Sequence, residues 1–213
     1  MAERTVVVVG GGLAGLSTAI ELCQRGVKVK LFSYVPVRRS HSVTAQGGIN
    51  ASIDVRGEGD SPEIHFQETV VGGDFLAHQP PALKLCYAAP DIVYLLDRMG
   101  VPFNRTPEGN LDFRGFGGTL YHRTAFAGAT TGQQLMYALD EQVRRFEAMG
   151  LAEKYEYWSF QRLLFDSERR ARGIVALNMP TMELIAFPAE AVVMATGGPG
   201  LLFGTKTTNS PVL

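Results

Sequence analysis

The stretch Thr5–Gly15 reads TVVVVGGGLAG and decides the fold. Its four valines form a short β-branched apolar run, which is typical of a buried parallel strand. The glycines that follow match the pattern G-x-G-x-x-G, whose tight turn lets backbone N–H groups approach a pyrophosphate. The stretch therefore predicts a strand, a dinucleotide-binding turn and a helix. A glycine-rich turn that binds no ligand is the alternative interpretation.

The chain continues this unit as a βαβ fold requires. Apolar residues at helical spacing predict a helix over 13–25, and 27–32 reads as the second strand. Many such folds place an acidic residue after this strand to hold the adenosine ribose, but this chain has Ser33 there. A serine hydroxyl still bonds a ribose and does not repel a phosphate, so the motif alone does not distinguish FAD from NAD(P).

Helices and a late run of strands make up the remainder. The class predicted is α/β, a Rossmann-like domain with a parallel sheet and a small antiparallel β-meander. A short helix is expected to open at 47–52, and 111–129 is expected to be irregular and to line a site. The other expected elements are helices over 62–71, 82–99 (interrupted at Pro90) and 131–150, and strands over 158–165, 173–178, 183–187 and 191–196.

Composition excludes several functions. The 213 residues carry 20 Lys and Arg against 21 Asp and Glu, so no net field attracts nucleic acid. Apolar runs fall far short of the ~20 residues that a membrane-spanning helix needs. The first strand begins near the N-terminus, which predicts no signal segment and a cytoplasmic chain. The two cysteines lie far apart, so neither a metal site nor an iron–sulfur cluster is expected.

The run Arg38–Gly48 reads RRSHSVTAQGG. Within and just after it, Arg39–Ser42 (RSHS) and Ala45–Asn50 (AQGGIN) resemble the flavin-attachment segment of the succinate dehydrogenase and fumarate reductase flavoprotein subunits. Two further matching segments, 57–62 and 122–132, are particularly similar to the Bacillus-type enzymes, which use a single cytochrome b anchor and menaquinone. The further matching segments are 57–62 (GEGDSP), 72–76 (GGDFL), 96–100 (LDRMG), 116–119 (FGGT), 122–132 (HRTAFAGATTG) and 195–198 (ATGG).

This resemblance implies a covalent FAD bonded through His41 to its 8α carbon. Only a neutral imidazole has the lone pair to attack that carbon, and the neighbouring Arg38 and Arg39 disfavour a further positive charge. The residues implied in cofactor binding are Gly10, Gly11, Gly12, Leu13, Ala14, Gly15, Ser33, Arg39, Ser40, His41, Ala45, Gln46, Gly47, Gly48, Thr196 and Gly197.

The resemblance assigns no catalytic residue within the chain, since the family's proton-transfer and dicarboxylate-binding residues are expected beyond Leu213. Phe116 and Gly117 resemble a segment close to the flavin and the bound dicarboxylate, and they are second-tier candidates. Arg123 is a further candidate for binding a carboxylate. His65 is expected on a helix surface, His78 in a loop, and His122 in a stretch that approaches the site.

The implied function is that of a succinate:quinone oxidoreductase flavoprotein subunit. Its FAD exchanges hydride with succinate or fumarate and passes electrons to an iron–sulfur subunit, then through a cytochrome b membrane anchor to quinone, with menaquinone favoured. Such a subunit is peripheral, on the cytoplasmic side of the membrane. Residues 1–213 are expected to form the N-terminal part of the FAD-binding domain, without the capping and C-terminal helical domains, and to be inactive alone.

Two alternatives remain open at this point. An L-aspartate oxidase-like flavoprotein shares the Ala-Gln-Gly-Gly text but normally lacks a histidine at the position of His41. A noncatalytic FAD-binding fragment is the other.

Overall fold

The computed structural model describes residues 4–198. The chain forms two compact units, which we call the sheet unit (residues 4–43 and 139–198) and the helical unit (residues 44–138). The boundary between them falls inside helix α4 (Thr131–Ala148).

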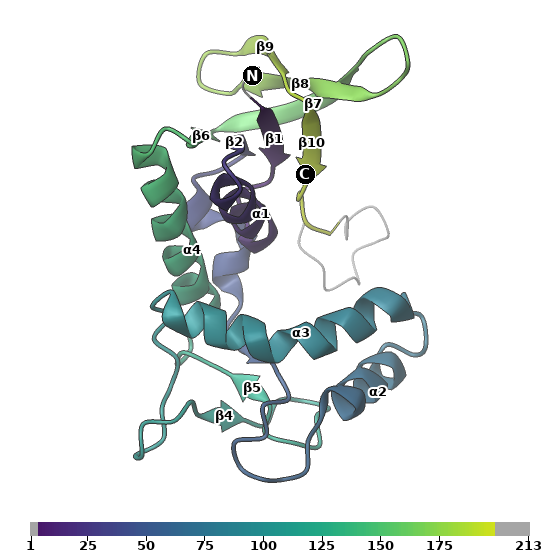
Figure 1. The fold of residues 1–213 in the computed structure, drawn as a ribbon, viewed down its shortest axis with the longest axis vertical. Helices are drawn as coiled ribbons and strands as arrows, with labels where there is room; N and C mark the ends of the chain where they lie inside the picture. Colours follow the sequence, from purple (N-terminus) through teal and green to yellow (C-terminus); the bar gives the residue numbers. More distant parts are fainter. Residues whose placement is uncertain (1–3, 199–213) are drawn as a thin grey trace. The chain divides into compact units, whose positions relative to one another are not determined.

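A four-stranded parallel sheet forms the centre of the sheet unit, in the order β10-β1-β2-β6. Figure 1 shows β1 between β10 and β2. Val7 and Val8 of β1 have no exposed surface, as expected for a strand with neighbours on both sides. The bounds are β1 (Thr5–Val9), α1 (Leu13–Gln24), β2 (Lys28–Ser33), β6 (Ala152–Glu156) and β10 (Ala191–Met194).

The sheet confirms the predicted α/β class and its opening βαβ unit. Strand β6 was not predicted because its sequence, AEKYE, contains no apolar run. It lies at the edge of the sheet and pairs with β2 alone, so it does not need to be apolar on both faces.

The predicted antiparallel meander is also present, as β7 (Trp158–Phe165), β8 (Ala171–Asn178) and β9 (Glu183–Pro188). An aromatic cluster joins it to the parallel sheet. Phe32 of β2 stacks on Tyr155 with ring centroids 4.6 Å apart, and Phe187 meets Phe32 edge to face at 4.7 Å. Such pairs add to the burial of apolar area that holds these strands together.

Two helices and a small sheet make up most of the helical unit. Helix α2 begins as predicted, because the hydroxyl of Ser61 accepts the N–H of Ile64 at 3.2 Å and Pro62 occupies the first turn. The bounds are α2 (Pro62–Gly72), α3 (Gln79–Arg98), β3 (Ile49–Asn50), β4 (Phe113–Arg114) and β5 (Thr124–Ala125), with the sheet order β3-β5-β4.

Two expectations for this unit were wrong. Helix α3 does not break at Pro90. Proline removes one helical hydrogen bond, but a buried stripe of Cys86, Ala89, Val93 and Leu96 runs past it and holds the helix in place. Residues 47–52 do not open a helix either. They form a bend at Gly47 and the short strand β3, which pairs with β5.

The irregular stretch expected over 111–129 likewise contains the short strands β4 and β5, which pair with one another. In the described residues 4–198, no helix is long and apolar enough to cross a membrane.

Candidate functional site

The glycine turn between β1 and α1 leaves no room for side chains. A Cβ on Gly10 would lie 2.1 Å from the carbonyl oxygen of Ala195, and one on Gly15 would lie 1.7 Å from the carbonyl oxygen of Gly10. Gly10 also has a φ of 118°, which glycine adopts without strain. These contacts explain the glycines at both positions: strand and helix meet backbone to backbone.

The start of α1 is open to an anion. Gly12 is the N-cap residue and has no side chain to cap the helix. The N–H of Leu13 makes a long contact with the hydroxyl of Ser42, at 3.4 Å. Uncapped N–H groups and the partial positive charge of a helix N-terminus suit a phosphate group. The turn therefore fits the pyrophosphate predicted from the motif.

Three other predicted cofactor residues lie at the same edge of the parallel sheet. Ser33 ends β2 and is buried beneath the turn, where a Cβ on Gly11 would lie 2.5 Å from its hydroxyl. Thr196 and Gly197 follow β10, the other neighbour of β1, and both are exposed. Ligands of open α/β sheets bind at this edge, beyond the carboxyl ends of the strands.

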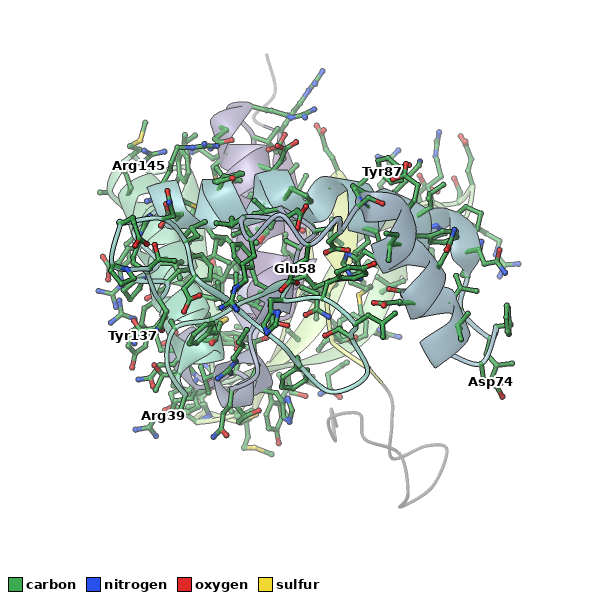
Figure 2. All side chains as sticks on the ribbon, turned by 90° about the horizontal axis from the view of Figure 1, so that it is seen from below. Arg39, Glu58, Asp74, Tyr87, Tyr137 and Arg145 are labelled. Atoms are coloured by element: carbon green, nitrogen blue, oxygen red, sulfur yellow. The ribbon has the colours of Figure 1, made fainter. Side chains whose placement is uncertain are left out.

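His41 lies in the segment that follows β2. It begins a short 3₁₀ helix (His41–Thr44) that follows another (Val37–Arg39). His41 and Arg39 are exposed, as the labelled position of Arg39 in Figure 2 shows, whereas Ser40 between them is buried. Because Ser42 contacts the first N–H of α1, the structure brings the predicted attachment residue and the phosphate turn together within the sheet unit.

A buried carboxylate holds the other side of this segment. The side chain of Asp140 is fully buried, and its oxygens accept hydrogen bonds from Arg38 Nε at 2.6 Å, Lys154 Nζ at 2.7 Å and Arg144 Nε at 3.1 Å. Arg38 also pairs with Glu141. The positive charge of Arg38, which lies near His41 in the sequence, is thus directed to carboxylates.

Burial alone would raise the pKa of Asp140. The hydrogen bonds from Lys154 and Arg38, together with the charges of Lys154 and Arg144, reverse that effect, so the pKa lies below its ordinary value. Sequence reasoning missed Asp140, since it lies 102 residues from Arg38 and no local motif marks it.

In the helical unit, backbone contacts hold the predicted segment Ala45–Gly48. The carbonyl of Ala45 accepts the N–H of Gly132 at 2.7 Å. Arg114 donates to the carbonyl of Gln46 at 3.0 Å and, through Nε, to that of Gly47 at 3.1 Å. Arg114 is a second residue that sequence reasoning missed.

The second-tier candidate Phe116 lies against this segment. A Cβ on Gly47 would come within 2.7 Å of its ring. Phe116 and Gly48 line the same cavity of about 480 Å³, whereas Gly117 does not. The other lining residues are Ile49, Asn50, His65, Leu85, Ala89, Ile92 and Val93.

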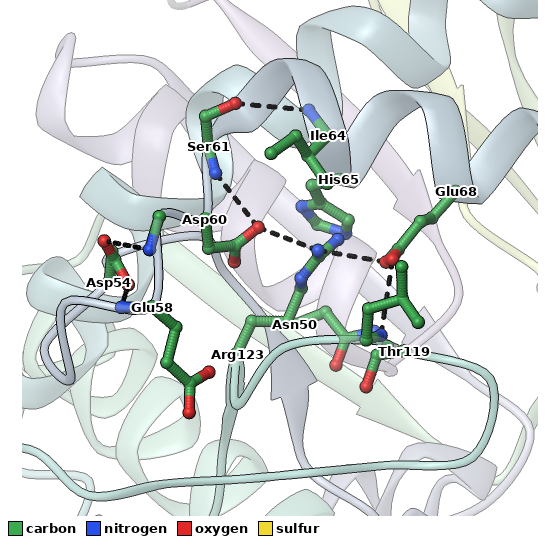
Figure 3. A network of polar contacts seen from close by, with 12 residues as sticks. Asn50, Asp54, Glu58, Asp60, Ser61, Ile64, His65, Glu68, Thr119 and Arg123 are labelled. Atoms are coloured by element: carbon green, nitrogen blue, oxygen red, sulfur yellow. Dashed lines mark hydrogen bonds and ion pairs between the residues drawn. The ribbon is translucent and has the colours of Figure 1, made fainter.

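The structure removes Arg123 as a candidate for binding a substrate carboxylate. Its side chain is fully buried, and Nη2 pairs with Asp60 at 2.8 Å and with Glu68 at 2.9 Å (Figure 3). Both carboxylates therefore come from the protein itself. Within the described residues, Arg123 Nε and Nη1 have no hydrogen-bond partner.

The histidines of the helical unit differ from expectation in one case. His65 is buried rather than at the helix surface, because α2 turns it toward Arg123. Burial, and then the positive charge of Arg123, lower its pKa. His122 contacts Glu58, with Nδ1 2.6 Å from Oε1, while His78 is exposed before α3, as expected for a loop residue.

The open helix N-terminus, the glycine turn and the parallel sheet define a dinucleotide-binding fold. The sequence model of the family described as "FAD binding domain" matches residues 5–212, and the chain belongs to this family.

Its relatives confirm the resemblance seen in the histidine run. The chain is 62% identical over 212 residues to the succinate dehydrogenase flavoprotein subunit of Bacillus subtilis, covering all of this chain and 36% of that protein. It is 36% identical over 218 residues to the fumarate reductase flavoprotein subunit of Escherichia coli, covering 99% of this chain and 34% of that one. The chain thus spans about a third of the length of these curated relatives.

Solved structures agree. The Mycobacterium smegmatis Sdh1 complex in the apo form superimposes with a TM-score of 0.88 at 31% identity, over 92% of this chain and 35% of that one. A quinol-fumarate reductase with menaquinol molecules gives a TM-score of 0.83 at 33% identity, over the whole of this chain and 36% of that one.

Proposed function

We propose that this chain supplies the FAD-binding part of the flavoprotein subunit of a succinate:quinone oxidoreductase, with the flavin bonded covalently to His41. One observation carries the proposal: an exposed histidine directly precedes Ser42, whose hydroxyl contacts the open N-terminus of the dinucleotide-binding helix. The identity to succinate dehydrogenase and fumarate reductase flavoprotein subunits supports it.

In the sheet unit, the turn Gly10–Gly15 holds the pyrophosphate through its backbone N–H groups and the α1 dipole. Ser33 bonds a ribose hydroxyl, and Thr196 and Gly197 line the same sheet edge. Arg39 and Ser40 directly precede the attachment residue. Ala45–Gly48 of the helical unit, carried over from the resemblance, are the remaining proposed contacts.

The covalent bond forms between a ring nitrogen of His41 and the 8α carbon of FAD. The imidazole N–H and one methyl C–H break as the C–N bond forms. The two electrons and two protons released pass to an external two-electron acceptor, and dioxygen, which becomes hydrogen peroxide, serves in air. His41 acts as the nucleophile and must be neutral to do so.

The flavin, once bound, supplies hydride transfer to and from a dicarboxylate. Phe116 and Gly117 are the proposed neighbours of succinate or fumarate in this chain. The proposed electron path leads to an iron–sulfur subunit, a cytochrome b membrane anchor and quinone, with menaquinone favoured. The subunit is then peripheral to the cytoplasmic side of the membrane.

Denaturing electrophoresis under ultraviolet light tests the covalent bond directly. The full flavoprotein, as its gene encodes it, is produced in the native host. We expect flavin fluorescence to migrate with the protein and to be lost in His41→Ala. The matched control is His78→Ala, an exposed histidine outside the segment, which keeps the fluorescence. Fluorescence only at the dye front of the unaltered protein refutes the covalent bond.

Dye reduction separates this function from that of an L-aspartate oxidase. The same preparation is assayed with succinate and with L-aspartate. Turnover with succinate and not with L-aspartate supports the proposal. Turnover with L-aspartate and not with succinate refutes it.

A further inference from the structure

We infer that Asp140 is a positioning residue for flavin attachment, because through Arg38 it fixes the segment that presents His41. The inference rests on the proposed function and names a residue that neither the dinucleotide motif nor the attachment segment contains.

Asp140 connects three segments of the sheet unit. Of its three cationic partners, Arg144 belongs to the same helix and Lys154 to strand β6. Only Arg38 comes from the attachment segment, and its contact of 2.6 Å is the shortest of the three. Arg144 and Lys154 already compensate the buried charge, so the Arg38 contact adds a link between α4 and the segment rather than a needed counter-charge.

The attachment segment is held on both sides of His41. Before it, the N–H of Val37 donates to the Glu156 carboxylate at 2.9 Å, and the side chain of Val37 is buried. After it, the hydroxyl of Ser42 accepts the N–H of Leu13. Within the segment, the N–H of Ser40 donates to the carbonyl of Val37 at 3.1 Å. The backbone of His41 is therefore held in place, although its side chain is exposed.

Attachment requires a close and well-oriented approach of two atoms. The ring nitrogen and the 8α carbon must approach to roughly 3–3.5 Å in a suitable orientation, and a displacement of about 1 Å can slow a reaction by about 100-fold. Noncovalent binding of FAD depends instead on the backbone N–H groups of the phosphate turn, whereas Arg38 Nε donates to Asp140. Loosening the segment should thus slow bond formation without releasing the cofactor.

The experiment follows covalent attachment in the full flavoprotein made in its native host. The variants are Arg38→Gln, Asp140→Asn and the double variant, with Arg144→Gln as the matched control that removes an Asp140 partner outside the segment. The gel fluorescence of acid-precipitated protein is measured over time after induction and divided by total bound flavin. Thermal unfolding is recorded in parallel.

We expect Arg38→Gln and Asp140→Asn each to slow attachment by about tenfold or more, with total flavin retained. The double variant should fall no further, because both changes break the same link. Arg144→Gln should attach flavin at the unaltered rate. Should Asp140→Asn fail to fold, the contrast between Arg38→Gln and Arg144→Gln still decides, since both of these side chains are partly exposed.

Equal rates in Arg38→Gln and Arg144→Gln would overturn the inference, and so would losses that simply follow thermal stability in both. Unaltered protein without covalent flavin refutes the proposed function itself. If the unaltered protein carries covalent flavin and the variants attach it at the same rate, only the role of Asp140 is refuted.

Discussion

The two units bury charge in opposite ways. In the sheet unit, a single carboxylate, Asp140, is surrounded by three cations. In the helical unit, a single guanidinium, Arg123, meets two carboxylates, those of Asp60 and Glu68. Each central group is completely buried, and each connects segments far apart in the sequence.

The difference lies in the partners. Around Asp140, the side chains of Arg38 and Arg144 are 37% and 53% exposed, so water shares in stabilising them. Around Arg123, Asp60 is 2% exposed and Glu68 19%. The first cluster can lose a partner and rehydrate the remainder, whereas the second cannot. Burial of the partners, more than their number, should decide how much each cluster matters for folding.

The largest effect is expected from Arg123→Met. The change leaves the buried Asp60 and the largely buried Glu68 without a counter-charge, which should cost about 3–5 kcal/mol of unfolding free energy. Urea unfolding of the full flavoprotein measures it, with Arg170→Met, at a surface ion pair, as the control. A loss no larger than that of the control would show that these carboxylates find other compensation.

Asp140→Asn should be less damaging, at about 1.5–3 kcal/mol, the value typical of hydrogen bonds to a charged group. The pKa of Asp140 is lowered in the folded protein, so its stabilising effect is present above the ordinary value of 3.8 and is lost as the pH falls below it. The difference between the unaltered protein and Asp140→Asn should therefore persist at pH 7 and disappear under strongly acidic conditions. A difference independent of pH contradicts an ionised Asp140.

His65 sharpens the comparison, because it lies beside Arg123 and its pKa responds to that charge. Its pKa is lowered by burial and by the charge of Arg123, so the unfolded chain takes up a proton near pH 6.5 before the folded chain does. The free energy of unfolding should keep its full contribution from neutral His65 above pH 6.5 and decline as the pH falls below that value. His65→Leu should flatten this decline between pH 7 and 5, whereas His78→Leu, at an exposed histidine, should not.

Local features of the molecule were predictable from the sequence, and long-range charge contacts were not. The glycine turn and the strand Trp158–Phe165 were predicted with their observed positions, because each is written in a short run of neighbouring residues. Arg38 and Asp140 lie 102 positions apart, and Arg123 and Asp60 lie 63 apart. An exposed charged residue and a buried one look the same in a sequence, since only the fold supplies the partner.

The smallest effect is expected from Arg144→Gln, the mildest test of the contrast between the clusters. Lys154 and Arg38 remain on Asp140, and Arg144 is a half-exposed partner one helical turn away, so the loss should be about 0.3–0.5 kcal/mol. Salt screens exposed charges at distances beyond about 3 Å at 1 M, and most of this loss should vanish in 1 M NaCl. The Arg123→Met loss should survive the same salt, because Asp60 is only 2% exposed and Glu68 19%, and salt screens buried charges much less. Equal salt sensitivity of the two losses would mean that the clusters differ in number of partners alone, and that burial does not set their strength.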